Sequence, residues 1–128
     1  MRTLVFIPFL VLAIIGCNKT PDHVVQRSQK TGVPVETSKK IWSLLEDADK
    51  ADGMTEDQWA QFNQCMNDQD PAVRRDALVI LGGISSKKTT QKDRVIAALE
   101  KAKLDSDPEV SKGAEGFLRI FQGSPHPM

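Results

Sequence analysis

The sequence predicts an all-α fold in which helical hairpins stack side by side as an α-α superhelix. The first observation behind this prediction is an internal repeat: a run that begins at Asp68 recurs in part 37 positions later, at Asp105. The second is that apolar residues recur at helical spacing before both runs. The positions shared by the two runs are Asp68, Asp70, Pro71, Val73, Ala77 and Leu81 in the first copy and Asp105, Asp107, Pro108, Val110, Ala114 and Leu118 in the second.

Each copy is expected to consist of a helix, a tight turn and a second helix. The first helix of each copy carries an apolar stripe at i, i+3 and i+6, which places its members on one face. The stripe consists of Trp59, Phe62 and Cys65 in the first copy and of Ile96, Leu99 and Ala102 in the second. Because a single hairpin cannot bury such a stripe, the units are expected to pack against each other.

Helix boundaries are marked by capping residues. Thr55 and Gln58 form a capping-box pattern after the breaker Asp52-Gly53, and Asp70-Pro71 and Asp107-Pro108 begin the second helices. Gly82-Gly83 and Gly123 are expected to end them. The acid pair Asp68 and Asp70 is therefore interpreted as capping, not as a general acid and base.

A further helix is predicted over residues 36–49, before the first copy. Its apolar stripe consists of Ile41, Leu44, Leu45 and Ala48, and Pro34 lies 37 positions before Pro71. We interpret this segment as a degenerate second helix that caps the stack at its N-terminal end. The predicted domain thus covers residues 35–123, with about two repeats and an N-terminal capping helix.

The run from Asp68 to Gly82 resembles the second half of a HEAT repeat, in the short form also seen in phycobilisome-lyase-type repeats. Over residues 55–122 the resemblance implies a right-handed superhelix with the second helices along an inner face. It also implies a polar ladder between neighbouring units, in which Asp68 and Arg74 take part. Ser111 replaces the arginine in the second copy, so the ladder is expected to stop there.

The N-terminal residues have the layout of a secretory signal. Arg2 precedes an uncharged apolar run over residues 4–15, which is too short for a spanning helix and contains Pro8. The border Ile14-Ile15-Gly16-Cys17 resembles the lipobox of bacterial lipoproteins, although Ile15 stands where small residues are commoner. The resemblance implies removal of residues 1–16 and lipidation at Cys17, and Asn18 favours the outer membrane if the cell is Gram-negative. A plain signal peptide is the alternative.

Residues 17–34 are expected to form the lipidated cysteine and a flexible tether, because they show no sustained periodicity. A flexible chain of that length spans roughly 20 to 25 Å. Residues 124–128 are expected to be a disordered tail.

Composition excludes several classes of function. The formal net charge is zero and Tyr is absent, which argues against a nucleic-acid partner. The chain has only His23 and His126 as histidines, and no nucleophile and base pattern is recognisable. We therefore predict no catalytic residue, no metal site and no cofactor. Cys65 is expected to be a buried core residue with an unreactive thiol.

A partner surface is predicted on the second helices, opposite their buried stripes. Its residues are Arg75 and Val79 in the first copy and Lys112 and Arg119, beside Gly116, in the second. A merely solvated basic face is an alternative interpretation of the same residues.

Together these patterns predict a non-enzymatic lipoprotein of the bacterial cell envelope that binds an unknown envelope protein. A pilotin-like assembly or targeting factor and, more remotely, a lyase or other enzyme subunit are the alternatives. Self-association is a further expectation for a repeat stack.

Overall fold

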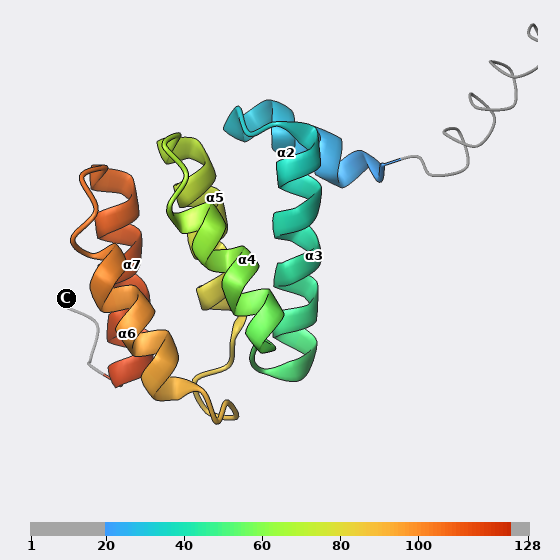
Figure 1. The fold of residues 1–128 in the computed structure, drawn as a ribbon. Coiled ribbons are helices and arrows are strands. Elements are labelled where there is room, and N and C mark those ends of the chain that lie inside the picture. Colours follow the sequence, from blue (N-terminus) through green and yellow to red (C-terminus); the bar gives the residue numbers. More distant parts are fainter. Residues whose placement is uncertain (1–19, 124–128) are drawn as a thin grey trace, which may run out of the picture.

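The computed structural model describes residues 20–123, which form six helices and no strand. They are arranged as three consecutive helix pairs: the last two pairs are antiparallel hairpins, and in the first pair the short helix lies across the N-terminal end of the long one (Figure 1). The helices are α2 (Asp22–Thr31), α3 (Val35–Ala51), α4 (Glu56–Met66), α5 (Pro71–Gly83), α6 (Lys92–Ala102) and α7 (Pro108–Gln122). The predicted signal segment 1–16, the lipidation site Cys17 and the predicted tail 124–128 lie outside the described residues.

The second helices of the hairpins form the backbone of the stack. Helix α5 packs between α3 and α7, and the first helices α4 and α6 each pack on the second helix of their own hairpin (Figure 1). This is the all-α stack of helical hairpins that the internal repeat predicts. The predicted capping helix corresponds to α3, which contacts α5 as the repeat arithmetic requires.

The core follows the predicted stripes with one shift. Trp59, Phe62 and Cys65 of α4 are all buried. In α6 the buried residues are Val95, Leu99 and Ala102, whereas Ile96 is only half-buried. The stripe of α6 therefore runs at i, i+4 and i+7, which follows the 3.6-residue turn of a helix more closely than i, i+3 and i+6.

The predicted N-terminal caps and the Gly123 cap are present, whereas Gly82-Gly83 forms no left-handed cap: α5 ends at Gly83 and its C-cap is Ile84, with a φ of −82°. The backbone N–H of Gln58 donates to Thr55 Oγ1 over 3.2 Å, and the backbone N–H of Thr55 donates to Gln58 Oε1 over 2.9 Å. These two hydrogen bonds form the capping box. Asp70 and Asp107 accept hydrogen bonds from the first turns of α5 and α7. Gly123 ends α7 with a φ of 68°, in the left-handed region that glycine adopts without strain.

The prediction of a flexible tether over residues 17–34 is wrong for most of that segment. Residues Asp22–Thr31 form α2, which packs on α3. Val24 and Val33 are each only 1% exposed, and the Ser28 hydroxyl donates to the Val33 carbonyl. Helix α2 is short and mostly polar, so its stability comes from packing on α3 and not from a periodic apolar stripe. The folded domain therefore begins at Asp22 instead of residue 35.

We expect Trp59→Ala to lower the free energy of unfolding by about 3 to 5 kcal/mol, because it leaves a cavity in the core. The Trp59 indole lies edge-on against Phe62 and is 2% exposed. Thermal unfolding followed by circular dichroism measures the effect, with Asn63→Ala on the exposed side of α4 as the control. An unchanged midpoint for Trp59→Ala would contradict the placement of this side chain.

Candidate functional site

The surface of α5 that faces away from α4 contains the first two predicted partner-binding residues. Arg75 and Val79 are both exposed, one helical turn apart, and Val79 is 38% exposed. Both line a shallow groove of about 460 Å³ between α2 and α5. The groove is lined by Arg27, Lys30, Thr31, Ala72, Arg75, Asp76 and Val79. Because α2 was not predicted, neither was this groove.

The other two predicted residues lie elsewhere. Lys112 and Arg119 are exposed on α7, and neither lines the groove between α2 and α5. Arg119 lines a separate shallow depression of about 240 Å³ between the ends of α6 and α7, where Glu100 and Glu115 also lie. All four residues are therefore exposed on the neighbouring second helices α5 and α7, and two of them line the groove beside α2.

Arg75 also has a structural contact. Its guanidinium lies 3.1 Å from the Asp107 carboxylate, which caps the first turn of α7. The Arg75 side chain remains 45% exposed, so part of it stays accessible to a partner.

An ion pair between Arg27 and Asp76 joins α2 to α5. Both Nε and Nη2 of Arg27 donate to Oδ1 of Asp76, whose side chain is only 3% exposed. The Arg27 guanidinium also lies 5.6 Å from the ring centroid of Trp42. The ring centroids of His23 and Trp42 are 4.8 Å apart. Oδ2 of Asp76 is buried without a hydrogen-bond partner among the described residues.

Sequence reasoning missed Asp76 because its counterpart 37 positions later is Gly113. The only signal was an acidic residue directly beside the buried Ala77. Such a residue is buried only when an opposite charge reaches it. That charge comes from α2, which the sequence pattern did not reveal.

A second ion pair joins the last two hairpins. Arg74 donates from Nε and Nη2 to both carboxylate oxygens of Asp105, over 2.9 and 3.0 Å. Its Nη1 donates to the Asp68 carbonyl over 2.8 Å. In the second copy the Ser111 hydroxyl donates to the Lys103 carbonyl within its own hairpin. Arg74 therefore links the second pair of helices to the third through Asp105, whereas Ser111, the residue at the equivalent position of the second copy, bonds only within its own hairpin.

The environment of Asp105 favours its charged form. Burial raises the pKa of this carboxyl, but hydrogen bonds from Arg74 and the Asp107 backbone, together with the Arg74 charge, outweigh burial. The pKa of Asp105 consequently lies below its ordinary value.

A third link depends on Gln91, which sequence reasoning also missed. Its side-chain amide accepts from the Met54 N–H over 2.9 Å and donates to the Met54 carbonyl over 2.7 Å. The indole N–H of Trp59 donates to the same Gln91 oxygen over 3.2 Å. Gln91 lies in the loop before α6, and its side chain thus satisfies the hydrogen-bonding groups of the Met54 backbone, just before α4.

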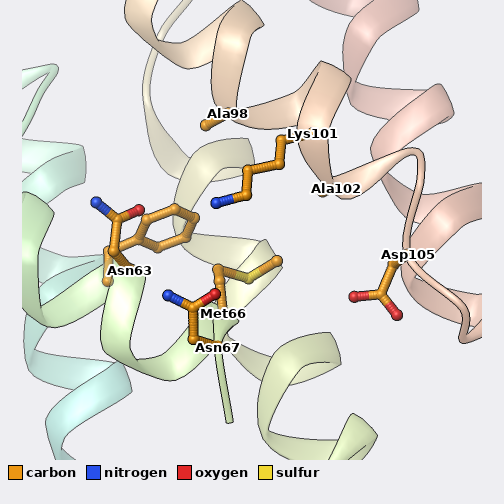
Figure 2. A pocket seen from close by; sticks show the side chains of 8 residues that line it. Asn63, Met66, Asn67, Ala98, Lys101, Ala102 and Asp105 are labelled. Atoms are coloured by element: carbon orange, nitrogen blue, oxygen red, sulfur yellow. The ribbon is translucent and has the colours of Figure 1, made fainter.

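A smaller groove of about 190 Å³ lies between α4 and α6 (Figure 2). Its apolar lining comes from Phe62 and Met66 on α4 and from Ala98 and Ala102 on α6. Asn63 and Asn67 lie on the α4 side. The Lys101 side chain extends from α6 across the groove toward α4, as Figure 2 shows. These residues offer van der Waals contact and hydrogen bonds, and they contain no nucleophile paired with a base.

Two further observations bear on chemistry. Burial raises the pKa of the Cys65 thiol, so the unreactive neutral form is favoured, which agrees with its predicted core position. Within residues 20–123 no three His, Cys, Asp or Glu side chains are grouped so that they could hold a metal ion.

None of the helices in this part of the chain is both long and apolar enough to cross a bilayer.

Comparison with family models, with curated proteins and with solved structures finds no match for this chain.

We expect Arg74→Ala to destabilise the domain by about 2 to 3 kcal/mol, because it leaves the Asp105 carboxylate without its charged donor. The loss should exceed that of Arg75→Ala, whose side chain is three times more exposed than that of Arg74, 45% against 14%. Equal losses in urea unfolding would contradict this ranking.

The same pair predicts a pH dependence. A carboxyl whose pKa is depressed in the folded state stabilises the fold above its unfolded pKa of about 3.9 and loses that contribution as the pH falls. The wild type should therefore lose stability as the pH drops below about 4, and Arg74→Ala should lose less over that range. Parallel stability curves for the two proteins would show that Asp105 does not carry this effect.

Proposed function

We propose that this protein is a lipid-anchored, non-enzymatic scaffold of the bacterial cell envelope whose HEAT-like helical domain binds an envelope protein. The observation that carries the proposal is Gly16-Cys17 directly after a short apolar run, followed by a stack of helical hairpins. Burying acyl chains stabilises membrane attachment by roughly 0.8 kcal/mol per CH₂ group, so two or three chains hold a protein durably.

Binding by shape and surface chemistry fits the described residues best. The stack presents exposed cationic side chains on its second helices, at Arg75, Lys112 and Arg119. On α7 they are accompanied by Ile120, which is 61% exposed. An exposed apolar side chain with basic neighbours favours a protein partner with an apolar contact and acidic residues.

Helix α7 is the more accessible part of this surface. On α5, Val79 shares its groove with α2, whereas α7 contacts a single second helix, α5, among residues 20–123 (Figure 1). We therefore assign the principal partner contact to Lys112, Arg119 and Ile120. If two copies of the chain stacked on each other, they would use the side of α7 that faces away from α5.

The anchor is tested by Cys17→Ser. We expect the wild type to incorporate labelled palmitate and to sediment with membranes, and the variant to lose both properties, because the serine hydroxyl cannot form the thioether. Cys65→Ala is the matched control, since it removes the other cysteine and should leave labelling unchanged. Equal labelling of Cys17→Ser and wild type would rule out the anchor.

The partner surface is tested by reversing the charge of α7 with Lys112→Glu and Arg119→Glu together. In-cell cross-linking and mass spectrometry should show that a specific envelope protein captured by the wild type is lost at least about tenfold in the variant, a change of 1.4 kcal/mol. The control reverses Lys87 and Lys88, which are exposed in the loop before α6. Equal capture by both variants would place the contact elsewhere.

A further inference from the structure

The distance between the lipidation site and the folded domain is short because α2 replaces most of the expected tether. Only five Cα-to-Cα steps separate Cys17 from Asp22, the first residue of α2. Whatever path they follow, these steps reach at most about 18 Å. A tether that ended at residue 34 could reach roughly 60 Å when fully extended.

Helix α2 cannot supply extra reach without leaving its place in the domain. Val24 and Ser28 are buried against the rest of the structure, and Arg27 forms the ion pair with the buried Asp76. His23, in the first turn of α2, contacts the Trp42 ring on α3. The beginning of α2 is therefore a fixed point of the domain close to the anchor.

We infer that the domain lies with its α2 side against the lipid headgroups of the bilayer that carries its anchor, and with the third hairpin directed away from them. This inference rests on the proposed lipidation of Cys17. It names the surface that the membrane occupies and leaves α7 free for the protein partner.

Charge favours the same orientation. Arg27, Lys30 and Arg75 line the groove between α2 and α5, where the acidic lining residue is Asp76, already paired with Arg27. Arg75 is paired with Asp107, and Asp22 is the acid of the first turn of α2. Lys30 remains as an exposed cation beside the groove. Cations near a bilayer are attracted to anionic headgroups.

Three of the four acids of α3 lie at the other end of that helix, and only Glu36 lies in its first turn. Glu46, Asp47 and Asp49 are exposed in its last two turns, whereas α2 crosses its N-terminal half (Figure 1). Helix α3 has 17 residues and is therefore about 25 Å long. An orientation with α2 at the headgroups holds these acids beyond the Debye length of about 8 Å at physiological salt.

The test uses the full mature chain purified with its acyl chains and placed in vesicles of phosphatidylcholine and phosphatidylglycerol. A fluorophore is attached at Gln29→Cys on α2 or at Ala97→Cys on α6, both exposed and uncharged positions, in a Cys65→Ala background. Lipids with a nitroxide on the headgroup quench nearby fluorophores. We expect quenching at position 29 to exceed that at position 97 by about threefold or more.

Matched charge reversals test the electrostatic part. Lys30→Glu should lower quenching at position 29, whereas Lys50→Glu, at the far end of α3, should leave it unchanged. If both variants behave alike, headgroup attraction does not turn this side to the membrane and the inference fails.

The outcomes separate this inference from the proposed function. Mass spectrometry of the purified chain shows whether Cys17 is acylated. An unmodified chain overturns both the anchor and the orientation. An acylated chain that is quenched equally at positions 29 and 97 overturns the orientation alone and leaves the anchored scaffold intact.

Discussion

The structure depends on the burial of α5 between two neighbouring second helices. A helix with apolar residues over much of its surface is stable in water only when other helices cover them. Helix α5 buries Val73, Ile80 and Leu81 in this way, and α3 and α7 pack on its two sides. The close contact with α7 requires a glycine, because a Cβ added at Gly82 would lie 2.5 Å from the Phe117 ring.

Polar contacts then join each hairpin to the next. Arg27 reaches Asp76, Gln91 reaches Met54 and Trp59, and Arg74 reaches Asp105. Each link pairs a buried or half-buried polar group with a partner that only the stacked arrangement supplies. A slip of one hairpin along another would leave these groups unpaired and largely out of water, which is costly. The polar links therefore specify the register, while apolar burial supplies the driving force.

Sequence reasoning predicted the parts of the fold that repeat. The 37-residue spacing places α5 and α7 as equivalent helices, and the caps at Thr55, Asp70 and Asp107 mark where helices begin. Local chemistry suffices for such features, because a cap and the helix that it begins are adjacent in the chain.

The contacts that were missed are those made by non-repeating residues at long range. Helix α2 has no extended apolar stripe, and its burial depends on Trp42 and Asp76, which lie far along the chain. For the same reason the groove itself was not predicted: Arg75 and Val79 line it from α5, but α2 forms its other wall.

Helix α2 connects the fold to the function, because its position fixes how far the domain can lie from the proposed anchor. Native-state hydrogen exchange of the backbone amides from Val25 to Gly32 tests this most directly. If α2 is part of the folded domain, these amides exchange slowly, and Val24→Asp releases their protection while the α5 amides stay protected. If these amides of the wild type exchanged at the rate of an unstructured chain, residues 22–32 would be a flexible tether after all, which would contradict the account.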